Sequence, residues 1–384
     1  MSKRILALTI AIVMMVSLFA GCGSSAGSGN TIKIGAIQPI SGQISVYGTQ
    51  SRDAINMAVK EINDNGGILG GKKLEVIVED DEANPEKTKN AFTKLVTKDK
   101  VVGIIGALTS SCSLAITKEA QQRKIVMISP SSTNDTVTDA GDYIFRACYK
   151  DSFQGPVVAQ YAIEKLGAKK AAILFDNKND YSVGMKENFK KKFTELGGAT
   201  VEESYAGGDK DFNAQITKLK AEAPDVLFIP DYYSTVSLIA KQVKQNGLDV
   251  PMLGADGWDE IANNAGEEVV GSYYSNHYAA DADDADVKTF VSNFKAAYGE
   301  DKTPNALAAL AYDATYILAE AIDKAGSTDP EKVKEAMKAT NRKFVTGQIQ
   351  FDAQNNPVKS ITMVKLVKGS DGKPALEFAG VVNP

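Results

Sequence analysis

The chain has 384 residues, a length that corresponds to two or three domains at roughly 150 residues per domain. Its composition is 43% apolar and 24% charged, close to the averages of folded soluble proteins, which argues against wholesale disorder, collagen and coiled coil. The net charge is −5 and the sequence contains no long basic run, which argues against a nucleic-acid partner.

The first twenty residues differ in composition from the rest of the chain. Lys3 and Arg4 precede an uncharged, mostly apolar run of sixteen residues from Ile5 to Ala20. This run is shorter than the ~20 residues that span a bilayer, and no later segment approaches that length. A basic start, a short apolar core and small residues at its end predict an export signal over residues 1–21.

The export signal ends in Phe19-Ala20-Gly21-Cys22, which resembles a bacterial lipobox, the recognition sequence for attaching lipid to a cysteine. The following residues, 22–30, are rich in Gly and Ser and predict a flexible tether. We therefore expect the mature protein to begin at Cys22 and to be held by acyl chains on the extracytoplasmic face of the bacterial cell membrane. Without the signal, 41 basic and 48 acidic side chains give a net charge of −7. Plain secretion is the alternative.

Two further cysteines, Cys112 and Cys148, have no partner that the sequence identifies. They could pair in an oxidising compartment, but buried small apolar cysteines are the commoner case in a large domain. We predict that they form no structural disulfide.

From Thr31 onward, short β-branched runs alternate with amphipathic stretches, as in βαβ units of a parallel sheet. In the first amphipathic stretch Ile55, Val59 and Ile62 share one face of a helix, and Pro85 opens the next helix after Asn84. The predicted elements of this first set are strands at 32–37, 74–79, 101–105 and 125–129 and a helix at 47–63.

A second set of alternating elements starts after residue 152. Its predicted strands are 171–175, 199–204, 226–229 and 251–253, and its helices are 184–196, 212–221 and 233–246. The chain then continues with helices at 286–298 and 305–325 and strands at 348–352, 361–367 and 376–382. These last elements are too few for a third domain, so we expect them to complete the first two.

The pattern predicts an α/β fold with two doubly wound parallel-sheet lobes joined by a multi-crossover hinge. The crossovers are expected near Tyr149, Tyr278 and Asn355, and such a hinge permits the lobes to close on each other. The predicted boundaries are 31–149 with 278–355 for lobe 1, and 150–277 with 356–384 for lobe 2.

One glycine-rich segment imitates a phosphate-binding loop. Residues 66–72 have the spacing, but Lys73 stands where Ser or Thr would hold magnesium. The segment also follows a helix and precedes a strand, the reverse of the order that points amides at phosphate. A turn is the better interpretation.

A cluster of acids imitates a calcium loop. It contains Asp281, Asp283 and Asp284, but an EF-hand would need Gly where Asp286 stands and Glu where Ser292 stands. Asp286 is instead expected to cap the helix that follows.

Catalytic and metal signatures are weak elsewhere. His277, the one histidine in the sequence, cannot build a multi-histidine metal site and is interpreted as structural. The sequence has no Gly-x-Ser-x-Gly elbow, and its cysteines lack metal-ligand spacing. We therefore predict that the protein is not an enzyme and needs neither a metal nor a cofactor.

Small and polar residues follow two neighbouring predicted strands, in segments 104–113 and 126–133. In an open parallel sheet, the loops after the carboxyl ends of strands line the ligand crevice. Backbone amides at a helix start, joined by Ser and Thr hydroxyls, can hold a small carboxylate without any cation. Simple helix capping explains the same residues about as well.

The second lobe places aromatic rings and acids at the corresponding edge, in segments 174–181, 228–233 and 253–258. An acid such as Asp256 can hold an ammonium group through charge-assisted hydrogen bonds, and aromatic faces add cation and apolar contact. A carboxylate site in one lobe and an ammonium site in the other indicate an α-amino acid.

Several short motifs occur in a defined order along the chain from residue 31 to the end. They are Ile34-Gly35-Ala36, Ser41-Gly42, Tyr47-Gly48, Asn65-Gly66-Gly67-Ile68, Asp80-Asp81, Ser110-Ser111, Ser129-Pro130-Ser131-Ser132-Thr133, Asp151, Gln154-Gly155, Tyr181, Gly184, Asp256-Gly257 and Ala311-Tyr312-Asp313. Their order and spacing resemble the leucine/isoleucine/valine-binding proteins, which are type I periplasmic solute-binding proteins of branched-chain amino acid ABC transporters. The resemblance implies a monomeric receptor that captures a branched-chain or other small apolar amino acid in an interlobe cleft and presents it to the permease subunits of an ABC transporter.

The resemblance also assigns polar ligand contacts. Ser110 and Thr133 match residues that hold the ligand carboxylate, and the Ser131 carbonyl and Thr133 hydroxyl match groups that help to hold the ammonium. Thr109, in the same loop as Ser110, is a further candidate. The acidic anchor falls on Asp256, where the family commonly has Glu.

Aromatic and apolar positions carry over in the same way. Tyr47, Tyr181 and Tyr232 match aromatic positions around the cleft, and Leu108 and Leu307 match apolar positions near the ligand side chain. They complete the predicted lining.

The sequence departs from the family pattern in ways that leave alternatives open. Asp256 is one methylene shorter than Glu, so ligand placement or identity can differ, and Trp258 either narrows the pocket or packs beside it. The first-lobe disulfide of some members lacks one partner, because no Cys lies between Cys22 and Cys112. The alternatives are a receptor of the same fold for an amide, γ-aminobutyrate or an aromatic acid, and an enzyme on this scaffold.

Overall fold

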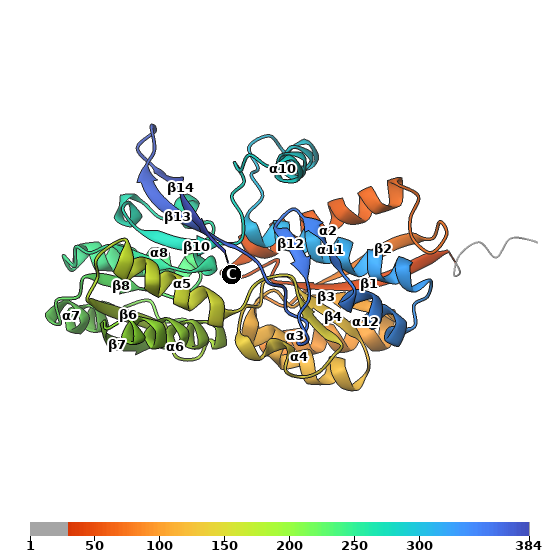
Figure 1. Cartoon of the computed structure of the whole chain (residues 1–384), viewed down its shortest axis with the longest axis horizontal. Coiled ribbons are helices and arrows are strands. Elements are labelled where there is room, and N and C mark those ends of the chain that lie inside the picture. The colour runs from red at the N-terminus through yellow and green to blue at the C-terminus, as the bar shows by residue number, and fades with distance from the viewer. Residues whose placement is uncertain (1–29, 384) are drawn as a thin grey trace, which may run out of the picture.

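Two β-sheets with helices packed on them dominate the computed structural model, which describes residues 30–383 (Figure 1). The predicted export signal, most of the tether and the lipidation candidate Cys22 lie outside the described residues. The two sheets lie side by side along the long axis of the molecule, and the chain ends near the middle (Figure 1).

The first sheet has five parallel strands in the order β2-β1-β3-β4-β5. Its inner strands read as continuous apolar runs because a parallel sheet is covered on both faces. Strand β5 was not predicted from the sequence. The strands are β1 (Thr31–Gln38), β2 (Lys73–Asp80), β3 (Gly103–Ile105), β4 (Val126–Ser129) and β5 (Ile144–Arg146).

Helices cover both faces of this sheet. In Figure 1, α2 and α11 lie on one side of β1 and β3, and α3 and α4 lie on the other. The helices of this lobe are α2 (Ser45–Asp64), α3 (Pro85–Lys94), α4 (Ser110–Gln122), α11 (Ala306–Ala325) and α12 (Pro330–Lys338), with a short π-helix η1 (Leu95–Asp99) and a short 3-10 helix η2 (Asp135–Thr138).

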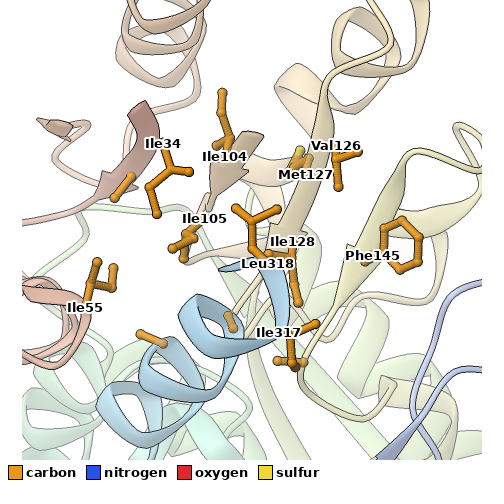
Figure 2. Close-up of a cluster of buried hydrophobic side chains, with 14 of the residues drawn as sticks. Ile34, Ile55, Ile104, Ile105, Val126, Met127, Ile128, Phe145, Ile317 and Leu318 are labelled. Carbon is orange, nitrogen blue, oxygen red and sulfur yellow. The ribbon is translucent and has the colours of Figure 1, made fainter. Parts of the chain in front are cut away.

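The core of the first lobe joins segments that are far apart in sequence. Figure 2 shows Ile105 and Ile128 of neighbouring strands beside Ile317 and Leu318 of α11. Each fully buried side chain of this kind contributes about 1.5–3 kcal/mol of transfer free energy. This packing ties α11, which follows the second lobe in sequence, to the first sheet.

The second sheet has seven strands in the order β14-β13-β10-β9-β8-β6-β7. Strands β6 to β10 are parallel, whereas β13 and β14 run antiparallel. Strand β13 runs antiparallel to both of its neighbours, β10 and β14, and the short turn that joins β13 to β14 forces those two strands to run in opposite directions. The strands are β6 (Lys170–Asp176), β7 (Ala199–Tyr205), β8 (Val226–Phe228), β9 (Met252–Gly254), β10 (Tyr273–Asn276), β13 (Ile361–Lys368) and β14 (Pro374–Val382).

Consecutive residues of the second sheet point into two different cores. Leu227 belongs to one cluster and Phe228 to another, and Leu174 and Ile173 are divided in the same way. This alternation places helices on both faces of the sheet. The helices are α5 (Asp151–Glu164), α6 (Asp180–Glu195), α7 (Asn213–Ala221), α8 (Tyr233–Gln245) and α9 (Ile261–Asn264), with the turns η3 (Asp256–Trp258) and η4 (Glu267–Val269).

Two elements near the crossovers differ from the expectation. The strand predicted at 348–352 does not join a main sheet, because β12 (Gly347–Gln350) pairs with β11 (Asn341–Phe344) in a separate hairpin. Helix α10 (Ala285–Tyr298) is capped by Asp284, whose carboxylate accepts from the amides of Asp286 and Val287 at 2.9 and 3.3 Å, so the predicted cap at Asp286 was wrong.

The predicted cap at Asn84 is confirmed, since its side chain accepts from the amides of Glu86 and Lys87. The turn at residues 66–72 is also confirmed, and it is closed by an isolated bridge between Ile68 and Lys72.

The chain passes between the two lobes after β5, after β10 and after β12. The α/β fold of two parallel-dominated sheets is thus as predicted, whereas the lobe boundaries at individual residues stay predictions.

Candidate functional site

Nine of the ten predicted ligand-binding residues line one cavity. The cavity is small, because in this conformation the lining side chains leave about 10 Å³ of open volume, room for about one water molecule. Thr133, the tenth, is buried but does not line the cavity. The lining consists of Tyr47, Leu108, Thr109, Ser110, Ser131, Tyr181, Tyr232, Asp256, Leu307 and the additional Gly257.

The fold explains how residues 260 positions apart meet here. The carboxyl ends of parallel strands form one edge of each sheet, and loops leaving that edge reach the crevice between the lobes. Tyr47 comes from α2 and Leu307 from α11. The others follow strands: Leu108, Thr109 and Ser110 follow β3, Ser131 follows β4, Tyr181 follows β6, Tyr232 follows β8, and Asp256 and Gly257 follow β9.

The first lobe supplies a polar wall of hydroxyls and backbone amides. Ser110 is the first residue of α4, so its amide lies at a helix N-terminus that favours negative charge. Its Oγ accepts from the amide of Asn134 at 3.2 Å, and Oγ of Ser131 donates to the carbonyl of Leu108 at 2.8 Å. These bonds fix the two loops and leave a surface suited to a carboxylate.

Unsatisfied acceptors lie behind this wall. Oγ1 of Thr133 and both carboxylate oxygens of Asp151 are buried and have no hydrogen-bond partner among residues 30–383. Burial raises the pKa of Asp151 well above its usual range; the neighbouring hydroxyl of Thr133 opposes this rise, and the nearby charge of Asp256 adds to it. An ammonium group would supply the missing donors.

The second lobe supplies a buried acid. Oδ1 of Asp256 accepts from the hydroxyl of Tyr181 at 2.9 Å, and Oδ2 lies 3.0 Å from Nε2 of His277. Burial raises the pKa of Tyr181 well above its usual range, so the phenol stays protonated and donates to the carboxylate. The acid is therefore held by two side chains at the cavity wall.

Three tyrosines and two leucines form the apolar part of the cavity. The rings of Tyr181 and Tyr232 stack with centroids 5.3 Å apart and planes 11° apart, and Tyr47 meets Tyr232 edge-on at 6.3 Å. Together with Leu108 and Leu307 they offer the contact that an apolar side chain needs.

Close packing after β9 explains why position 257 is a glycine and where the side chain of Trp258 lies. A Cβ on Gly257 would lie 2.8 Å from the carbonyl oxygen of Asp231 and 3.0 Å from Oη of Tyr181, so only glycine fits. Trp258 is fully buried, and its Nε1 donates to the carbonyl of Ile229 at 2.8 Å. Trp258 thus packs in the second lobe and does not line the cavity.

Hydrogen bonds across the cleft hold the lobes closed over the cavity. The hydroxyl of Tyr47 donates to the carbonyls of Gly257 at 2.7 Å and Asp259 at 3.0 Å. On another side, Nδ2 of Asn134 donates to the carbonyl of Asp180 at 2.8 Å. A small molecule inside would therefore be surrounded by both lobes.

Two residues next to this cavity, His277 and Asp151, were not predicted from the sequence. His277 was interpreted as structural, and a lone histidine after a strand gives no signal that it contacts an acid 21 residues earlier. Asp151 was part of a recognised motif, but only the folded structure shows that its carboxylate oxygens are buried without a hydrogen-bond partner among the described residues.

Other features of the described part concern metals, membranes and thiols. Within residues 30–383, no three His, Cys, Asp or Glu side chains cluster as metal ligands would. None of the helices between residues 30 and 383 has the length and apolar character needed to span a bilayer. Cys112 and Cys148 are free and buried, and burial raises the pKa of each thiol to about 12.

Comparison with known families matches residues 31–373 to the family described as periplasmic binding protein. A relative from Pseudomonas aeruginosa, the leucine-, isoleucine-, valine-, threonine- and alanine-binding protein, is 33% identical over 342 residues, which cover 88% of this chain and 90% of that protein.

Solved structures of the same architecture bind different small molecules. The leucine binding protein LivK from Thermotoga maritima has a TM-score of 0.86 and 36% identity, covering 92% of this chain and 99% of that one. LivJ from Streptococcus pneumoniae in complex with isoleucine has a TM-score of 0.84 and 34% identity, covering 92% and 100%. A solute binding protein of an ABC transporter from Rhodopseudomonas palustris in complex with 3,4-dihydroxybenzoic acid has a TM-score of 0.82 and 28% identity, covering 92% and 98%.

Proposed function

Because this chain belongs to the periplasmic binding protein family, we propose that it captures a branched-chain or other small apolar α-amino acid between its lobes and delivers it to the permease of an ABC transporter. Its resemblance to the leucine/isoleucine/valine-binding proteins is confirmed by its relatives. The family places the protein outside the cytoplasm.

One observation carries the choice of an α-amino acid. A buried carboxylate, Asp256, faces the same closed cavity as the amide and hydroxyl groups of Ser110 and Ser131. A buried charge needs a partner of opposite sign, and an α-ammonium group provides one while the ligand carboxylate meets the helix start.

The proposed roles follow from this arrangement. Ser110 holds the ligand carboxylate through its amide and hydroxyl. Asp256 and the Ser131 carbonyl hold the ammonium, and Thr133 and the acid Asp151, which are buried outside the cavity lining, are further candidates for this contact. The apolar lining described above surrounds the ligand side chain, and each buried methylene contributes about 0.8 kcal/mol, which favours leucine over alanine by a few kcal/mol.

Isothermal titration calorimetry with each of the twenty amino acids tests the proposal. We expect binding at micromolar ligand or below for leucine, isoleucine or valine, and weaker binding for alanine. Failure of every amino acid to bind at micromolar concentration would overturn it.

A receptor for an aromatic acid is the second candidate, and the Rhodopseudomonas palustris neighbour with 3,4-dihydroxybenzoic acid supports it. A ligand without an α-ammonium group should not need Asp256, so unchanged affinity in Asp256→Ala would favour this candidate. Amides and γ-aminobutyrate belong in the same titration, and turnover of any of these compounds would indicate an enzyme.

The membrane anchor is proposed on the lipobox-like segment alone. Expression in a bacterium with a radiolabelled fatty acid should label the wild type and not Cys22→Ala. Label in both, or in neither, would contradict the anchor at Cys22. Sedimentation of the purified protein tests the proposed monomer.

A further inference from the structure

We propose that His277 is a positioning residue: its neutral imidazole donates the Nε2 hydrogen to Asp256 and holds that carboxylate where the ligand ammonium meets it. This inference rests on the proposed function, because it concerns the acid of that site. The side chain is completely buried, and Nε2 lies 3.0 Å from Oδ2 of Asp256.

The surroundings of the ring select its protonation state. An ionised carboxylate only accepts hydrogen bonds, so the hydrogen between the two groups belongs to Nε2. Nδ1 is buried and has no partner in the part of the chain that the structure describes. A doubly protonated ring would bury an unpaired N–H donor and a charge, which costs more than an unsatisfied neutral acceptor.

The electrostatic surroundings agree with a neutral ring. Burial lowers the pKa of His277; the hydrogen bond and charge of Asp256 oppose this change, and the charge of Lys359 reinforces it. The imidazole therefore acts as a neutral donor to Asp256 near pH 7.

The ring itself is held in place. It stacks on Tyr149 with centroids 3.9 Å apart and planes 23° apart. Nε2 of Gln154 in turn donates to the hydroxyl of Tyr149 at 3.3 Å and to Oγ of Ser275 at 2.9 Å. Because His277 follows β10 and Tyr149 precedes α5, the acid of the site is tied to two of the segments that cross between the lobes.

The carboxylate needs this support for a geometric reason. Its two oxygens use separate donors, Tyr181 for Oδ1 and His277 for Oδ2. Loss of either donor frees the torsion of the Asp256 side chain and leaves one buried oxygen unsatisfied. Tyr181 also lines the cavity, whereas His277 does not, so substitution of His277 perturbs the acid without changing the cavity lining.

Nuclear magnetic resonance tests the protonation state directly. The sequence contains one histidine, so a protein purified without a histidine tag gives a single set of imidazole nitrogen signals. We expect a protonated Nε2 and an unprotonated Nδ1 at pH 7. A proton on Nδ1 alone, or on both nitrogens, would overturn the proposed hydrogen bond.

Calorimetry tests the effect on the ligand. His277→Gln keeps an N–H donor near the Nε2 position and should bind leucine within a few-fold of the wild type. His277→Leu removes the donor and should weaken binding about 10- to 100-fold, as expected for a hydrogen bond to a charged group. Thermal melting verifies that both variants fold. Equal affinity of the wild type and a folded His277→Leu variant would overturn the positioning role.

A double-mutant cycle keeps the inference separate from the proposed function. If His277 acts through Asp256, His277→Leu should have little further effect in the Asp256→Asn background. Additive losses would contradict it. If the wild type binds no amino acid, the proposed function fails and the ammonium role fails with it, while the nitrogen signals still decide whether His277 donates to Asp256.

Discussion

The two walls of the cavity hold their chemistry in different ways. The first-lobe wall uses Ser110 and Ser131, whose hydroxyls bond to backbone atoms of neighbouring loops. The second-lobe wall uses the carboxylate and rings of Asp256, Tyr181 and Tyr232, which bond and stack on one another. The first wall suits a carboxylate, because its hydroxyls are fixed to the backbone beside a helix start. The second wall suits an ammonium group, because its buried acid is held between donor side chains and aromatic rings.

Removal of the Asp256 carboxylate from the second-lobe wall should cause the largest loss of ligand affinity. In Asp256→Ala the ammonium loses its buried counter-charge, which typically costs about 3–5 kcal/mol, so affinity for leucine should fall at least about 100-fold by calorimetry. Asp231→Asn is a matched control, because Asp231 is a buried acid of the same lobe that accepts from Tyr205 and does not line the cavity. An equal loss in both variants would indicate a general structural effect.

Substitution of Asp151, the second buried acid, should change leucine affinity and folding stability in opposite directions. Burial raises the pKa of Asp151 above its unfolded value, so its contribution to stability is present at low pH and is lost as pH rises through the folded pKa. Asp151→Asn should therefore be more stable than the wild type at pH 7 and should bind leucine about tenfold more weakly. Chemical unfolding at pH 4 and pH 7 with calorimetry measures both effects. Reduced stability of the variant at pH 7 would contradict this account.

The first-lobe wall should tolerate loss of a hydroxyl better than the second lobe tolerates loss of its acid. Ser110→Ala keeps the helix N-terminus and its amide, and removes one hydrogen bond to a charged ligand group. We expect affinity to fall about tenfold, less than in Asp256→Ala. A loss as large as that of Asp256→Ala would show that the hydroxyl, and not the helix start, holds the carboxylate.

The bond across the cleft should have the smallest effect on affinity. Tyr47→Phe keeps the ring in the cavity and removes the donor to Gly257 and Asp259, so the closed form should be less populated. Affinity should fall a few-fold, and small-angle X-ray scattering without ligand should show a larger radius of gyration. Tyr233→Phe is a useful comparison, since its hydroxyl makes one longer bond of 3.3 Å to the carbonyl of Gln43.

The pH dependence of folding stability tests Lys359, a buried lysine close to the crossover near Asn355. Lys359 is buried, donates to the carbonyl of Ala147 at 3.1 Å and to Thr346, and burial lowers its pKa to about 8. A lysine with a lowered folded pKa binds fewer protons folded than unfolded between that value and its ordinary ~10.4. Stability should thus rise with pH above 8 relative to Lys359→Met, as measured by urea unfolding at pH 7 and pH 9.5. Parallel pH profiles of the two proteins would contradict the lowered pKa.

Local sequence patterns predicted most of the fold. Alternating strands and helices, the cap at Asn84 and the turn at residues 66–72 depend on neighbours within a few positions, and the structure confirms them. The sequence patterns did not predict β5, β10, α5 or α12, and they did not predict that β12 pairs with β11 in a separate hairpin. The cap at Asp284 was missed because several adjacent acids have similar capping propensity.

By itself, the sequence determined the class of fold and the residues of the cavity lining. Strand ends, loops and the family motifs are short runs of neighbouring residues, so they can be recognised without the tertiary structure. Only the tertiary structure decided that Trp258 packs away from the cavity, that Asp151 is buried without a partner, and that His277 holds the acid. Each of these depends on the burial of one side chain and on its contacts with segments distant in sequence. Desolvation and hydrogen bonding act through space, so no local pattern records them.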